Sequence, residues 1–156
     1  MADEEVVEPG ASITLTWTVR NADSCSATGG WSGDRAASGS EIVGPLSVNT
    51  TYKLTCSGVG GNALVMITVF VNGVVQLSWI APTENMDGSN LNDLVGYKIY
   101  YGVQSRGYVD SVRVNGSNVT QYELNIPMGT YYVAMTAMDA EGNESMFSNE
   151  LVKDSI

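Results

Sequence analysis

The sequence predicts an all-β protein made of two tandem β-sandwiches. Short stretches of alternating apolar and polar residues recur along the chain, and this period of two is typical of half-buried strands. The stretches are separated by turn-forming residues, and the chain contains 17 glycines. No segment longer than a turn or two places apolar residues at the 3.6 spacing of a helix. Together these observations favour sandwiches over α/β units.

The first half of the chain contains three predicted strands. Residues 12–19 alternate strictly, and residues 51–56 repeat the pattern. Residues 63–71 (ALVMITVFV) form a nearly continuous apolar run, which predicts a strand that is buried on both faces or closes a sheet. The glycine-rich residues 27–40 and 58–62 are interpreted as the intervening turns.

The dipeptide Asn72-Gly73 is a strong tight-turn signal that could join two strands of one sheet. We interpret it instead as a very short domain linker, because the strand pattern restarts after it with a second tryptophan, Trp79. The predicted domains are therefore residues 1–71 and residues 72–156.

The second half contains five predicted strands, all short and alternating and separated by Gly, Asn or Pro turns. Such spacing is typical of a second sandwich. The predicted strands cover residues 75–79, 96–102, 110–116, 121–126 and 130–139.

The composition excludes several function classes. The net charge is −10, from 7 basic and 17 acidic residues, and no cluster of Lys and Arg exists to bind a nucleic-acid backbone. Histidine is absent, which removes His-based general bases, catalytic triads and imidazole metal ligands. No run of 18 apolar residues is present, so we expect no membrane insertion. We predict a non-catalytic protein without a cofactor.

The only two cysteines are Cys25 and Cys56. Two thiolates alone cannot complete a tetrahedral zinc site. We expect a structural disulfide, which implies an oxidising location at some stage.

The second half resembles a fibronectin type III domain over residues 74–156. The motifs LSWIAP, VGYKIYYG and YELNIPMGTYYVAMTAMD carry the resemblance. It implies that Trp79 is the core tryptophan of strand B and that Tyr97 lies on the inward face of strand C. It also implies that Tyr131 is the tyrosine-corner residue, with its ring between the sheets and its hydroxyl bonded to the backbone.

The first half resembles the small bacterial immunoglobulin-like domains of surface and virion proteins, through LTWTVRNADSCSATGGWSG and TTYKLTCSGVGG. The resemblance places Trp17 in the core of strand B. A Cys25–Cys56 bridge would then join strand C to strand F, unlike the B–F bridge of antibody domains. The stretch VVEPG allows only a stub of a first strand, so a sheet edge is expected to stay open. Val6 and Val7 in this stub are candidate partner contacts, because exposed edges pair readily with another chain.

Trp31 is a second candidate contact, because it lies in a glycine-rich turn and could be an exposed aromatic platform for a sugar or a protein partner. The alternative is that it folds back over the disulfide. Asp87 and Asp93 are weak calcium candidates, since the oxygen-rich loop around them lacks EF-hand spacing. Residues 139–150 carry further carboxylates, and we interpret them as a polar hairpin rather than as a glycosidase pair.

The sequence suggests a structural protein whose function is surface display. It opens on Met and an acidic run without an apolar segment, unlike a secretory signal peptide. This start favours a bacteriophage virion surface protein, a capsid decoration or fibre protein that docks on the particle and exposes a rod for adhesion. The expected partners are a capsid or other virion protein, with a host-surface protein, a glycan or a second copy of the chain left open. The alternative is an adhesion, spacer or carbohydrate-binding module of a secreted bacterial surface protein or polysaccharide-degrading enzyme, located outside the cell.

Overall fold

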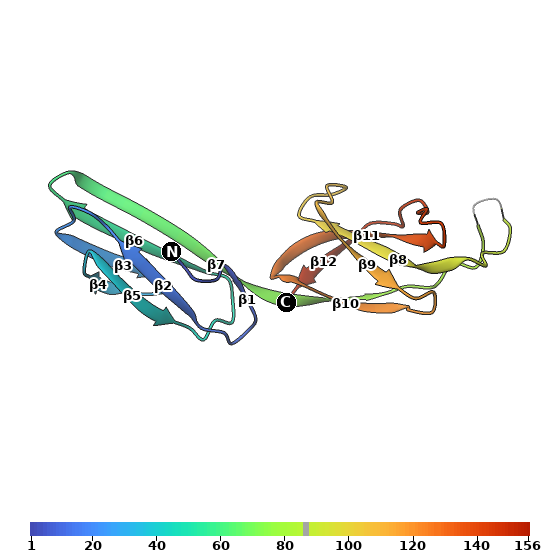
Figure 1. Ribbon diagram of the computed structural model, residues 1–156, viewed down its shortest axis with the longest axis horizontal. Helices are drawn as coiled ribbons and strands as arrows, with labels where there is room; N and C mark the ends of the chain where they lie inside the picture. Colours follow the sequence, from blue (N-terminus) through green and yellow to red (C-terminus); the bar gives the residue numbers. More distant parts are fainter. Residues whose placement is uncertain (86–87) are drawn as a thin grey trace. The chain divides into compact units, whose positions relative to one another are not determined.

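The predicted all-β fold is confirmed. The computed structural model describes residues 1–85 and 88–156, and this part of the chain forms strands β1 to β12 without a helix (Figure 1). No helix able to cross a membrane is therefore found among the described residues. The chain divides into two compact units, Met1–Gly73 and Val74–Ile156.

The first unit contains two sheets. The larger has the order β1-β7-β6-β3-β4, and the smaller pairs β2 with β5. The strands of the larger sheet are β1 (Val6–Val7), β3 (Ser24–Gly29), β4 (Gly33–Arg35), β6 (Thr50–Gly58) and β7 (Gly61–Ser78), and those of the smaller are β2 (Ile13–Thr18) and β5 (Ser38–Val43).

The disulfide joins neighbouring strands of the larger sheet. Cys25 on β3 lies directly opposite Cys56 on β6, and the two sulfurs are bonded. Both residues are buried and form a cluster with Ala27 and Leu54. Trp17 on β2 is partly buried and packs against this cluster.

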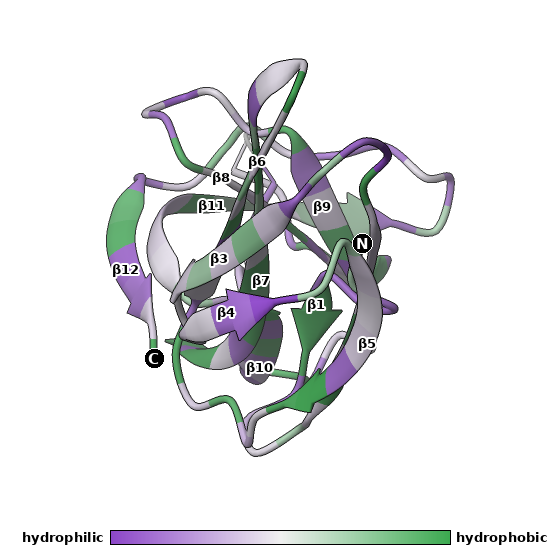
Figure 2. Cartoon of the chain, turned by 90° about the vertical axis from the view of Figure 1, so that its left-hand side faces the viewer, coloured by the Kyte–Doolittle hydropathy of each residue, from purple (hydrophilic) through white to green (hydrophobic). Residues whose placement is uncertain are grey.

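The apolar run of residues 63–71 predicts a strand that is buried on both faces or closes a sheet, and burial on both faces is wrong for its first part. The run belongs to β7, in which Val69 and Val71 are buried but Leu64, Val65 and Met66 are exposed. The reason is that β6 pairs with the strand on one side, whereas β1 reaches only Phe70 and Val71 on the other. Figure 2 shows hydrophobic residues in green along β7.

Asn72 and Gly73 do not form a tight turn, and the boundary between the two units falls directly after Gly73. Both residues lie inside β7, which continues to Ser78 and contributes its last residues to the second unit. The Asn72 side chain donates a hydrogen bond to the Glu8 carboxylate.

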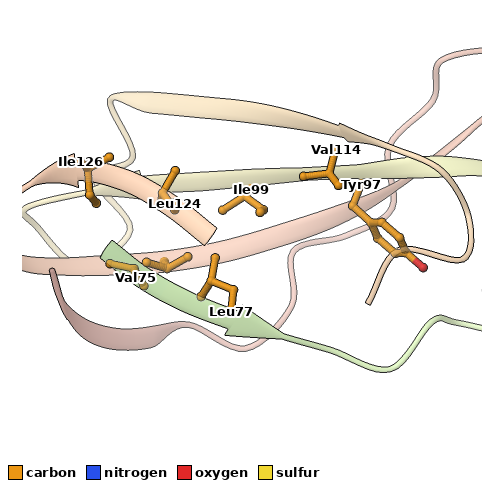
Figure 3. Packing of buried hydrophobic residues seen from close by; sticks show 8 residues of the cluster. Val75, Leu77, Tyr97, Ile99, Val114, Leu124 and Ile126 are labelled. Atoms are coloured by element: carbon orange, nitrogen blue, oxygen red, sulfur yellow. The ribbon is translucent and has the colours of Figure 1, made fainter. Parts of the chain in front are cut away.

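The second unit places a four-stranded sheet, β12-β11-β8-β9, against the pair formed by β10 and the end of β7. Its core lies between these layers, and Figure 3 shows the buried side chains of Val75, Ile99 and Ile126 pointing toward one another. The strands are β8 (Leu94–Gly102), β9 (Asp110–Asn115), β10 (Gln121–Pro127), β11 (Gly129–Asp139) and β12 (Leu151–Ser155).

Three aromatic residues anchor this second core. Tyr97 is fully buried, its ring packs edge-on against Trp79, and its hydroxyl donates to the Ser117 carbonyl. Tyr131, at the start of β11, donates its hydroxyl hydrogen to the Pro127 carbonyl at 3.0 Å. A tyrosine that bonds the backbone a few residues upstream at a strand crossing is the tyrosine corner of immunoglobulin-like sandwiches. The second unit is therefore fibronectin type III-like in its sheet order and corner.

Candidate functional site

Trp31 lies against the first core rather than standing free. Its ring packs edge-on against Trp17 and Tyr52, and its indole N–H donates to the Lys53 carbonyl at 2.9 Å. The ring also contacts the disulfide cluster, and the Arg35 guanidinium lies 5.1 Å from its centre. The structure thus places Trp31 as a folded-back residue and leaves only part of the ring exposed.

The two candidate contacts in the first strand have different environments. Val6 is exposed, whereas Val7 is buried at 4% exposure and cannot meet a partner in the folded unit. The residues before them are held by their own unit, because the Phe70 amide donates to the Glu5 carbonyl and the Asp3 amide donates to the Thr14 carbonyl.

Of the weak calcium candidates, Asp87 lies outside the described residues. Asp93 lies near Asp139 and Glu141, with carboxylate oxygens of the three residues within 4.8 Å of one another. The pKa of Asp139 is lowered mainly by the hydrogen bond from the Asn143 side chain. This cluster is open to solvent, and the Asn143 side chain and backbone amide already donate to the Asp139 carboxylate.

A more developed polar and aromatic surface lies on the second unit. We call the rings of Tyr100, Tyr108 and Phe147 the aromatic face. Tyr100 is on β8, Tyr108 follows that strand, and Phe147 comes from the connection between β11 and β12. The Phe147 ring centre lies 5.0 Å from that of Tyr100 and 5.5 Å from that of Tyr108, and Phe147 is 54% exposed.

Glu144 fixes one border of the aromatic face. Its carboxylate accepts hydrogen bonds from the hydroxyls of Tyr100 and Thr136 and forms an ion pair with Lys98 at 3.1 Å. The hydrogen bond from Tyr100 is the main reason that the pKa of Glu144 lies below its ordinary value. The Lys98 ammonium also lies 4.7 Å from the centre of the Tyr100 ring. The Tyr100 side chain, and then Glu144, raise the pKa of Lys98.

Glu150 fixes the other border in the same way. Its carboxylate accepts hydrogen bonds from the Ser105 hydroxyl at 2.6 Å, the Tyr108 hydroxyl at 2.6 Å and the Arg106 amide at 2.7 Å. The Ser105 bond is the largest cause of the lowered pKa of Glu150. Burial, and then Glu150, raises the pKa of Tyr108 to about 12. The two glutamates therefore hold the connection between β11 and β12 against the tyrosines.

The aromatic face combines exposed ring surface with carboxylate and hydroxyl oxygens at its borders. Such a surface can pack against the C–H groups of a sugar, because aromatic rings carry negative charge on their faces, and it can accept hydrogen bonds from hydroxyl groups. The sequence interpretation found the polar hairpin of residues 139–150 but not this face. The face depends on contacts between residues more than 40 positions apart, for which a single sequence holds no local signal.

A cavity of about 510 Å³ lies in the same unit, between Trp79, the core side of β11 and the residues that precede β12. The Trp79 indole nitrogen is buried without a hydrogen-bond partner among the described residues. Core side chains such as Tyr97, Ile99 and Val133 form much of the wall. The cavity is therefore a place where the hydrophobic core of the second unit opens to solvent.

Comparisons with known proteins relate half of this chain to enzyme segments. It is 35% identical over 81 residues to an amylopullulanase of Thermoanaerobacter thermohydrosulfuricus, a match that covers 51% of this chain and 5% of the enzyme. It is 35% identical over 82 residues to an amylopullulanase of Thermoanaerobacterium thermosulfurigenes, covering 52% of this chain and 4% of the enzyme. The chain thus spans a small fraction of these relatives. No family model matches it.

Among solved structures, the chain resembles chicken CNTN1 FN1-FN3 domains, with a TM-score of 0.42 and 14% identity over 99% of this chain and 66% of that one. It also resembles the fibronectin(III)-like modules of Clostridium thermocellum CbhA, with a TM-score of 0.34 and 12% identity over 97% of this chain and 91% of that one. Likenesses at this level carry no conclusion about function.

Proposed function

We propose that this chain is a non-catalytic accessory module of a secreted polysaccharide-degrading enzyme. The observation that carries the proposal is the 35% identity between half of the chain and segments of two amylopullulanases. The matched segments make up 5% and 4% of those enzymes, which fits an accessory region. The Cys25–Cys56 disulfide supports a location outside the reducing cytosol. The virion role expected from the sequence gains no support from these likenesses.

The substrate class of such a module is an α-glucan, by the names of the related enzymes. The aromatic face is the surface of the second unit best suited to contact the polymer. Phe147 offers the most exposed ring of the three. The Glu144 and Glu150 carboxylates each accept three hydrogen bonds within the unit, which leaves about one of their roughly four acceptor positions for a sugar hydroxyl. The role is to hold neighbouring enzyme parts near their polymer and not to cleave it.

Retention of the full chain on insoluble starch tests this proposal. We expect the unaltered chain to be retained and Phe147→Ala to lose most of this retention. Phe70→Ala is the matched control, because Phe70 is similarly exposed at 42% but lies on the first unit. Circular dichroism checks that both variants stay folded. Failure of the unaltered chain to bind starch, or equal retention of all three proteins, would argue against the aromatic face as a glucan contact.

A further inference from the structure

The first half of β7 is an unpaired and apolar sheet edge, which we call the open edge and define as residues 61–69. These residues pair with β6 on one side throughout. Among the described residues no strand pairs with their other side, because the parallel pairing with β1 begins only at Phe70. Figure 1 shows this part of β7, in green, at the border of the first unit. Its free backbone N–H and C=O groups can pair with another strand.

The middle of the open edge, residues 63–67, is apolar on both faces. Alternation along β7 places Val65 on the same inward face as Val69, and Leu64 and Met66 on the outward face. Exposure on the inward face nevertheless rises from 0% at Val69 to 58% at Val65, because the core of the unit does not extend that far. Leu64 and Met66 are 60% and 57% exposed.

A cavity of about 240 Å³ lies under the open edge and shows that the core is incomplete there. Its wall includes Val65 and Ile67 from β7 and Trp17 from the other sheet, together with Trp31 and Tyr52. An additional strand on this edge would place side chains beside the cavity and shield these rings from water, which is favourable for apolar surface.

The open edge also lacks the features that prevent edge-to-edge association. Exposed edges are commonly protected by Lys, Pro, charged side chains or bulges. Residues 59–71 contain no charged residue and no proline, although the chain as a whole has a net charge of −10. The pairing of β7 with β6 runs without a bulge. An uncharged strand that is apolar on both faces suits this edge, and the middle of β7 itself has this property.

We propose that the open edges of two copies of this chain pair antiparallel and form a two-fold symmetric dimer. With the axis at Val65, each Val65 lies opposite its own copy, Ala63 lies opposite Ile67, and Leu64 lies opposite Met66. Residues directly opposite in an antiparallel pair share a face, so within residues 63–67 every apolar side chain meets another apolar side chain, and Asn62 meets Thr68. The arrangement buries the same patch on both copies and closes on itself, as isologous interfaces do. It does not depend on the proposed role in polysaccharide degradation.

Sedimentation of the full chain across the micromolar range, combined with amide hydrogen exchange, tests the dimer. We expect a monomer–dimer equilibrium in which the amides of residues 61–69 become protected as the dimer forms. Val65→Lys places two ammonium groups opposite each other at the axis and should raise the dissociation constant at least about ten-fold, or about 1.4 kcal/mol. Ile42→Lys is the control with the same added charge, because Ile42 is 75% exposed on β5 of the same unit, and it should leave the dimer intact.

Several outcomes would overturn the proposal. A chain that stays monomeric at the highest concentration excludes it. So does a dimer that forms without added protection of residues 61–69, or one that Val65→Lys and Ile42→Lys weaken equally. Binding of a different protein to the open edge of a monomeric chain would assign the edge another occupant. Growth into open-ended oligomers would contradict the closed two-fold pairing.

Discussion

At the scale of single residues, the hydroxyl of Tyr131 links the start of β11 to the backbone of the preceding strand. Tyr131→Phe removes the donor at 3.0 Å from the Pro127 carbonyl and leaves that carbonyl unpaired. We expect a loss of about 1–3 kcal/mol in the free energy of unfolding, the usual effect of an unsatisfied buried acceptor. Denaturant unfolding measures it, and Tyr122→Phe, for which no hydroxyl bond is described, should be close to neutral. Equal stability of the unaltered chain and Tyr131→Phe would show that the corner does not stabilise the fold.

Glu144 and Glu150 make the stability of the second unit depend on pH. Both carboxyl groups have a pKa below the ordinary value of 4.5 in the folded chain, mainly through hydrogen bonds from Tyr100 and Ser105 respectively. The unfolded chain therefore binds more protons as the pH falls, so the stabilisation is fully present above pH 4.5 and is lost as the pH drops through the lowered pKa values.

Melting temperatures measured from neutral to acidic pH check this dependence. The melting temperature of the unaltered chain should fall below pH 4.5. The double variant Glu144→Gln, Glu150→Gln should have a lower melting temperature at neutral pH, and its melting temperature should change less with pH. Glu141→Gln serves as the control, because Glu141 is exposed on the same connection. A double variant with the unaltered profile would mean that these hydrogen bonds do not contribute.

At the scale of elements, β7 shows what a strand pattern can and cannot predict. The apolar and β-branched run of residues 63–71 predicts a strand correctly, because such side chains fit a pleated backbone. It does not predict burial, which depends on how far the neighbouring strand extends. The short stretch of residues 6–10 indicated the exposure of β7 better than the apolar run did. A first strand this short leaves part of the neighbouring sheet edge uncovered. Asn72-Gly73 failed as a turn signal because β7 continues through both residues.

The disulfide between β3 and β6 stabilises the first unit. The Cys25–Cys56 bridge closes a loop with a sequence separation of 31, and loop-closure entropy for that length corresponds to roughly 3–4 kcal/mol. Reduction should therefore lower the melting temperature of the first unit clearly. The double variant Cys25→Ala, Cys56→Ala should melt low with or without reductant. A melting temperature that is unchanged by complete reduction would exclude this contribution.

At the scale of the whole molecule, the strand pattern and the aromatic landmarks were enough to predict an all-β chain. Trp79, Tyr97 and Tyr131 could be placed because each lies within a short motif with fixed spacing. The aromatic face could not be placed in this way, since Tyr108 and Glu150 meet only when β8 and the β11–β12 connection come together. The absence of histidine and basic clusters is a property of composition, which is why function classes were easier to exclude than to assign.

The central claim is that the chain contacts an α-glucan without cleaving it and does so through the aromatic face. Amide NMR spectra of the full chain, recorded as a soluble malto-oligosaccharide is added, test this claim most directly. We expect chemical shift changes that saturate and that centre on Tyr100, Tyr108, Phe147 and Glu150, with an oligosaccharide that remains intact. Spectra that do not change, shifts confined to Met1–Gly73, or cleavage of the oligosaccharide would contradict it.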